Sequence, residues 1–162
     1  MPACAGMTVL LLVLLCGPAL AKSSCYTRDE AEAEQGVRIH SELMVIGLNC
    51  QHLYKTGNGK NLYQAYREFS AAHGPLFAGY ETELLKFFKD QGAKDPELAL
   101  HDLRTAFANK ISSDAAKMRP DIFCYRYAPR IEQASAMDEA ALHKWAGKFF
   151  DDHPISYPIC GQ

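Results

Sequence analysis

Histidine and carboxylate side chains are the groups of this sequence that could carry out acid–base chemistry. The six histidines are His40, His52, His73, His101, His143 and His153. A histidine beside a carboxylate can move protons near neutral pH, as a small hydrolase requires. The candidate catalytic residues are therefore His40, Glu42, His52 and His101.

The spacing of these residues matches no metal or cofactor motif. The sequence lacks H-E-x-x-H, C-x-x-C-H, G-x-S-x-G, G-x-G-x-x-G and the phosphate-binding P-loop. Its cysteines show no C-x-x-C pair of the kind that holds structural zinc, and no EF-hand loop is present. We therefore expect no metal site and no cofactor.

Two local groupings favour structural interpretations over functional ones. His101 and Asp102 are adjacent, and adjacent residues on a helix do not face each other, so an exposed helix surface is favoured. Asn49, Gln51 and His52 surround Cys50. They could line a small polar pocket, but residues of these types more often cap the end of a helix.

The elements that must position these groups are helices. Thr27 and Glu30 form a capping box, while Asp95 and Pro96 fit the first two positions of a helix start. Apolar residues then recur at helical spacing. The expected helices span about 27–54, 61–73, 75–91, 95–118, 120–131, with a kink or restart at Pro129, and 135 or 138 to 149. No segment alternates as a strand does, so the fold class is all-α, a single bundle of five or six helices over residues 22–162.

The first predicted helix changes character along its length. Its first turns are charged, from Arg28 to Glu34, whereas Leu43 to Leu48 is apolar on every side. A helix that is apolar all round is usually buried. We therefore expect a central helix whose N-terminal half is solvated and whose C-terminal half is surrounded.

An apolar run near the N-terminus predicts a cleaved signal peptide over residues 1–21. The run, Thr8 to Leu15, has the length of a signal-peptide core and is too short to span a membrane. The small residues Ala19 and Ala21 then suit a signal peptidase. The start could be Met1 or Met7. The expected location is periplasmic or secreted, with no stable membrane anchor after cleavage.

Four cysteines remain after the leader: Cys25, Cys50, Cys124 and Cys160. An even number of cysteines in an exported domain predicts disulfides, here two. A continuous helix from residue 25 to 50 would span about 37 Å, whereas disulfide Cα atoms lie about 4.4–6.8 Å apart. Cys25–Cys50 is therefore disfavoured. Of the two remaining pairings, the helix directions of a bundle favour Cys50–Cys124 with Cys25–Cys160.

Charge excludes some partner classes. The net charge is −2, with both signs mixed along the chain and no Lys/Arg block or basic amphipathic stretch. Nucleic acid is therefore not an expected partner, and neither is a membrane surface.

Two stretches carry a family resemblance: HSELMVIGLNCQH, from His40 to His52, and LRTAFANKISSDAAKMRPDIFC, from Leu103 to Cys124. With these the chain resembles a group of small secreted bacterial helical proteins of unknown function. Some members of that group carry the label S-adenosyl-L-homocysteine hydrolase. That label implies a doubly wound, NAD-dependent enzyme, and this chain has neither a βαβ pattern nor the glycine fingerprint.

Two functional hypotheses follow. The first is a secreted or periplasmic protein-binding module, such as an inhibitor, an immunity-like protein or an envelope assembly factor. The second is a small cell-envelope hydrolase with a His/carboxylate site. A polar cleft with converging histidine and glutamate would favour the enzyme, and an uninterrupted apolar core would favour the module.

Overall fold

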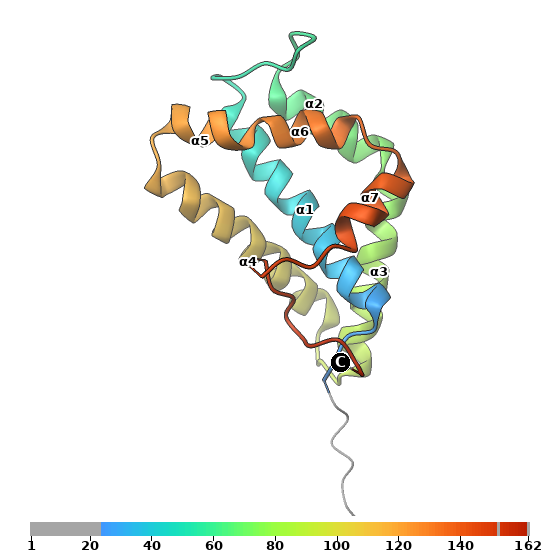
Figure 1. Cartoon of the computed structure of the whole chain (residues 1–162). Coiled ribbons are helices and arrows are strands. Elements are labelled where there is room, and N and C mark those ends of the chain that lie inside the picture. The colour runs from blue at the N-terminus through green and yellow to red at the C-terminus, as the bar shows by residue number, and fades with distance from the viewer. Residues whose placement is uncertain (1–23, 152, 162) are drawn as a thin grey trace, which may run out of the picture.

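Seven helices follow one another in the computed structural model, which describes residues 24–151 and 153–161 (Figure 1). They are α1 (Arg28–Cys50), α2 (Leu62–Ala72), α3 (Gly74–Asp90), α4 (Pro96–Lys117), α5 (Pro120–Tyr127), α6 (Pro129–Ser135) and α7 (Glu139–Ala146). Within these ranges the only β pairings are isolated bridges. The expected all-α class is confirmed.

The helix starts follow the capping signals in the sequence. The Thr27 side chain accepts a hydrogen bond from the Glu30 backbone, and the Glu30 side chain accepts one from the Thr27 backbone. Asp95 caps α4, with Pro96 in its first turn. Pro129 divides the stretch expected as one helix into α5 and α6, with Ala128 between them. This division raises the expected five or six helices to seven.

Two helix ends fall earlier than expected. α1 ends at Cys50 instead of Tyr54, because Leu53 and Tyr54 both donate backbone hydrogen bonds to the Cys50 carbonyl in a turn. α7 ends at Ala146 instead of Phe149, where Gly147 forms the C-cap.

α1 is the central helix and contacts all six others. Its apolar residues Val37, Leu43 and Ile46 are buried, in a core with Leu84 of α3 and Ile131 of α6. α2 and α3 run down one side of it, and α4 runs along another (Figure 1). α5 and α6 cross the end of the bundle at which α1 finishes.

The expectation of a solvated N-terminal half of α1 is wrong. Glu34, Gln35 and Arg38 are buried in that half. The physical reason is the segment after α7, residues 153–160, which lies against this half of α1 and supplies polar partners to all three side chains.

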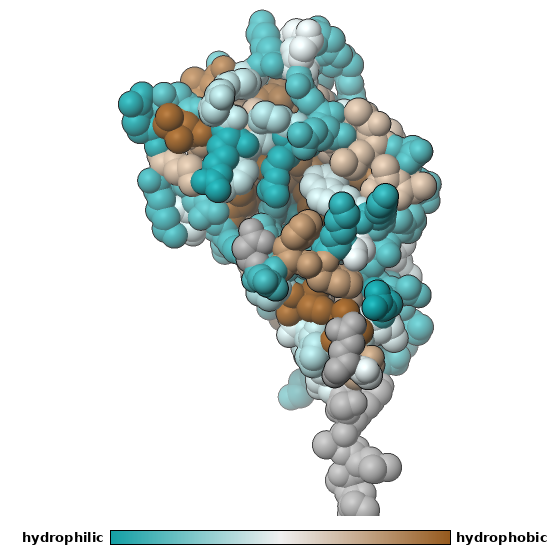
Figure 2. All heavy atoms as spheres, in the orientation of Figure 1, coloured by the Kyte–Doolittle hydropathy of each residue, from teal (hydrophilic) through white to brown (hydrophobic). Residues whose placement is uncertain are grey.

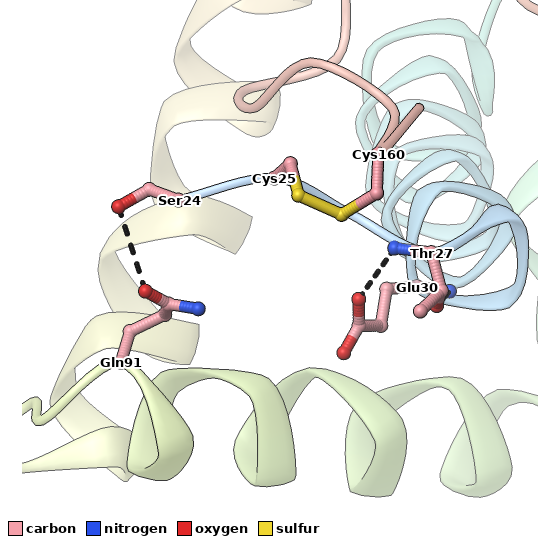
Figure 3. The surroundings of a disulfide bond; sticks show 6 residues. All are labelled: Ser24, Cys25, Thr27, Glu30, Gln91 and Cys160. Carbon is pink, nitrogen blue, oxygen red and sulfur yellow. Dashed lines mark hydrogen bonds between the residues drawn. A yellow bond between two sulfur atoms is a disulfide. The ribbon is translucent and has the colours of Figure 1, made fainter. Parts of the chain in front are cut away.

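The structure joins the cysteines in two disulfides, one near each end of α1. Cys50 is bonded to Cys124 of α5, with Cα atoms 5.5 Å apart. Cys25 is bonded to Cys160 of the C-terminal segment, with Cα atoms 5.1 Å apart. This is the pairing that the sequence favours. Figure 3 shows Cys25–Cys160 beside the Thr27–Glu30 capping box and the hydrogen bond from Ser24 to Gln91.

Candidate functional site

The four candidate catalytic residues do not meet in one site. His40 of α1 and His101 of α4 both line a cavity of about 270 Å³. Glu42 lines a different cleft, because residues two apart on a helix point to nearly opposite sides. His52 is exposed in the turn after α1. The structure therefore pairs two of the candidates and separates the other two.

His40 lies in a cluster of side chains from α1, α2 and α3. Its Nε2 atom lies 2.8 Å from Ser70 Oγ and 3.0 Å from Tyr66 Oη. Its ring stacks on Phe77, with centroids 4.3 Å apart. Burial, with a smaller contribution from the positive charge of Arg104, lowers the pKa of His40 to about 4. His40 is therefore a neutral, hydrogen-bonded ring at neutral pH.

The Ser70–His40 contact resembles part of a nucleophile–base pair but lacks its other components. Such a pair needs a base matched to the working pH and an acceptor that orients the second ring nitrogen. The pKa of His40 is too low for the first requirement. Among the hydrogen bonds of residues 24–151 and 153–161, none joins His40 Nδ1 to a carboxylate. Sequence reasoning missed Ser70 and Tyr66, because no motif connects them to His40.

Glu42 belongs to a charged cleft that we call the α4–α5 cleft. Its volume is about 380 Å³, and its lining residues are Glu42, Lys110, Ile111, Asp114, Arg126, Tyr127, Arg130 and His153. Glu42 accepts a hydrogen bond from Arg130 Nη1 at 3.1 Å and lies 3.6 Å from His153 Nε2. Figure 2 shows this face hollowed between α4 and the α5–α6 pair, with hydrophilic side chains around the hollow.

A row of buried polar side chains on α1 continues from this cleft toward the Cys25–Cys160 disulfide. Glu34 accepts hydrogen bonds from the Tyr26 hydroxyl at 2.8 Å and from the Ser156 backbone at 3.0 Å. Arg38 donates to the Pro154 carbonyl at 2.7 Å, and its guanidinium lies 4.2 Å from the Phe107 ring centroid. The row therefore holds the C-terminal segment in place.

A third cluster ties α1, α3 and α7 together. Tyr80 Oη lies 3.0 Å from Glu32 Oε1 and 3.1 Å from His143 Nδ1, and His143 also contacts that Glu32 oxygen. Burial and the Glu32 carboxylate raise the pKa of the Tyr80 hydroxyl, which keeps it protonated. The Tyr80 ring packs directly on Gly36 of α1. Sequence reasoning missed this cluster, since its members lie far apart along the chain.

α5 presents an exposed mixed face at the end of the bundle. Tyr125 is 74% exposed and Ile122 is 52% exposed. Tyr125 lies three residues after Ile122 and Arg126 lies four residues after it, so all three side chains share one side of the helix. We call these three residues the α5 face. Figure 2 shows a hydrophobic side chain standing out over α5 among hydrophilic neighbours.

The described residues contain neither a membrane-spanning helix nor a cluster of metal ligands. No helix within 24–151 is long and apolar enough to cross a membrane. In the same part of the chain, no group of three or more His, Cys, Asp or Glu side chains could hold a metal ion.

Comparisons with protein-family models, with curated protein sequences and with solved structures found no match for this chain.

Proposed function

We propose that this chain is an exported helical protein-binding module, of the inhibitor, immunity-like or envelope-assembly kind, that contacts its partner through the α5 face. The observation that carries the proposal is the exposure of Tyr125 and Ile122 on α5. Interfaces are enriched in aromatic residues and arginine, and a few such side chains supply most of the binding energy.

The position of the α5 face makes these side chains effective anchors. The Cys50–Cys124 disulfide joins α5 to the end of the central helix. Phe123, next to Cys124, is fully packed in the core. A surface held in this way loses little conformational entropy when a partner binds, so more of the contact energy appears as affinity.

Export is the second part of the proposal. The expected signal peptide, residues 1–21, lies outside the described residues. Support comes from the two cysteine pairs at disulfide distance, because disulfides persist in oxidising compartments. N-terminal sequencing of the protein purified from its host should then begin at Lys22. A protein that retains residues 1–21, or that remains in the cytosol, contradicts export.

Affinity isolation from envelope and secreted fractions tests the binding function. The baits are the wild-type protein, Tyr125→Ala, and Leu98→Ala as a matched control, because Leu98 is also exposed but lies on α4. One stoichiometric partner should be recovered with wild type and Leu98→Ala and lost with Tyr125→Ala. Equal recovery with all three baits would contradict the α5 face, and no partner with any bait would contradict the module.

The alternative function is a small cell-envelope hydrolase. Two observations favour it. Ser70 contacts His40 beside the cavity that His101 also lines. In the α4–α5 cleft, His153 Nε2 lies 3.6 Å from a Glu42 carboxylate oxygen, the convergence of histidine and glutamate expected of an enzyme. This alternative predicts turnover of peptidoglycan or phospholipid that is lost in Ser70→Ala and His40→Gln. Turnover that survives these changes and the changes Glu42→Gln, His52→Gln and His101→Gln would remove the proposed site.

A further inference from the structure

Positive charge is concentrated around the α5 face. Residues 110–130 contain five Lys or Arg and two Asp, a net charge of +3, in a chain whose total is −2. These residues cover the last third of α4, all of α5 and the start of α6. A partner that approaches α5 therefore meets a locally positive surface on a protein that is negative overall.

The α4–α5 cleft collects part of this charge next to the α5 face. Arg126 belongs to both. The guanidinium carbons of Arg126 and Arg130 lie 5.5 Å and 5.7 Å from the centroid of the Tyr127 ring. Arg130 uses Nη1 for its hydrogen bond to Glu42. A guanidinium has five N–H groups, so one such contact leaves donors for another acceptor.

The charge of the lining selects a particular kind of anion. The formal charges of Lys110, Arg126 and Arg130 against those of Glu42 and Asp114 sum to +1. One carboxylate would balance that charge, whereas a phosphate dianion would exceed it. Guanidinium forks also match a carboxylate in geometry.

The rest of the lining suits the side chain that carries such a carboxylate. Ile111 and the Tyr127 ring add apolar surface to the cleft. The methylene groups of a glutamate could lie on that surface while its carboxylate meets the two arginines. A free anion or a nucleic acid would bring no apolar protein surface to pack on the exposed Tyr125 and Ile122 of the neighbouring α5 face.

We propose that the α4–α5 cleft binds an acidic side chain, aspartate or glutamate, of the protein partner, while Tyr125 and Ile122 contact the apolar residues beside it. This inference rests on the proposed function and specifies its partner, an acidic residue flanked by apolar ones. Arg126 is the specificity-determining residue, because it lies on both surfaces.

A peptide titration tests the cleft without the partner. The probe is a capped Leu-Glu-Leu peptide, with capped Leu-Gln-Leu and inorganic phosphate as comparisons. The readout is the NMR resonances of the arginine side-chain N–H groups in the mature protein, as its host processes it. The glutamate peptide should shift the Arg126 and Arg130 signals in a saturable way at millimolar concentration. Absence of these shifts, equal shifts with the glutamine peptide, or tighter binding of phosphate would overturn the proposal.

Three variants should change the affinity for the glutamate peptide in different ways. Arg126→Gln should weaken binding of the glutamate peptide about tenfold, which corresponds to about 1.4 kcal/mol. Asp114→Asn should strengthen it, because it removes a negative charge from the cleft; a purely structural role for these residues predicts no such gain. Arg119→Gln is the matched control, since Arg119 pairs with Asp121 outside the cleft lining. Unchanged affinity in Arg126→Gln or weaker binding in Asp114→Asn would overturn the assignment.

The two proposals can fail separately. A partner that depends on Tyr125 but tolerates Arg126→Gln would leave the protein-binding function standing and remove the acidic contact. A glutamate peptide that binds the cleft, with no partner recovered, would remove the proposed function and leave the carboxylate site.

Discussion

Single residues determine how closely the helices of this bundle approach each other. Gly36 shows this best, because a Cβ atom at this position would overlap the ring of Tyr80. Tyr80 cannot easily turn away, since its hydroxyl contacts Glu32 and His143. The absence of one side chain on α1 therefore brings together the cluster that ties α1 to α3 and α7.

Gly36→Ala should destabilise the protein by about 1–3 kcal/mol, because the added methyl group forces a packed ring to move. Gly79→Ala is the matched control: Gly79 is exposed in α3, with nothing within 4 Å of an added Cβ. It should stabilise the protein by about 0.5–1 kcal/mol through helix propensity. Urea unfolding of both variants gives the comparison, and equal effects would contradict the close contact.

His40 should make stability depend on pH in the acid range. Its pKa in the folded protein is about 4, below the ordinary value of 6.5. Between these values the unfolded chain binds a proton that the folded chain does not, so the free energy of unfolding falls as pH falls from 6.5 to 4. The contribution is on the order of 1–3 kcal/mol, reduced where water reaches the half-buried ring.

Unfolding measured across this pH window in two variants tests the assignment. His40→Gln should lose less stability on acidification than wild type. His52→Gln, which changes an exposed histidine, should follow wild type. The same pH dependence in wild type and His40→Gln would contradict a neutral, half-buried His40.

At the scale of elements, local signals predicted the helices well and their surroundings less well. Thr27 with Glu30, Asp95 with Pro96, and Pro129 marked helix boundaries, because capping and proline effects act within a few residues. The burial of Glu34 and Arg38 could not be read in this way. It depends on residues 153–156, which are more than a hundred positions away and have no periodic pattern.

Separation along the sequence also limits how much of the candidate site can be predicted. His40 and His101 were chosen as residue types and do share a cavity, but Ser70 and Tyr66 were not identified. The α5 face was also missed, because Ile122 and Tyr125 have the spacing of core residues. Only the packing of Phe123 and Cys124 on the opposite side shows that they point outward.

The docking of the C-terminal segment, residues 153–160, should depend on the Cys25–Cys160 disulfide. This segment pairs with the chain before α1 through two backbone hydrogen bonds, from Tyr26 to Pro158 and from Cys160 to Tyr26, each 2.8 Å. Replacing Cys25 and Cys160 with serine should cost about 2–4 kcal/mol and speed hydrogen exchange at the amides of residues 26 and 156. Replacing Cys50 and Cys124 is the control, with similar loss of stability but without this local increase. Unchanged exchange in the first variant would contradict the role of the disulfide.

In the whole molecule, one disulfide lies near each end of the central helix. Cys25–Cys160 joins the two ends of the described chain. Near it, the charged side chains Glu34 and Arg38 of α1 are buried and hydrogen-bonded. Cys50–Cys124 supports α5, where apolar and basic side chains are exposed. We therefore propose that the end of the bundle carrying α5 contacts a protein partner.

Site-specific photocrosslinking in intact cells tests this claim most directly. A photoreactive phenylalanine analogue replaces Tyr125 in one strain and Leu98 in another, and adducts are identified by mass spectrometry. The account predicts one discrete protein adduct from position 125, reduced by Arg126→Gln, and none from position 98. No adduct from position 125, or the same adducts from both positions, would contradict it.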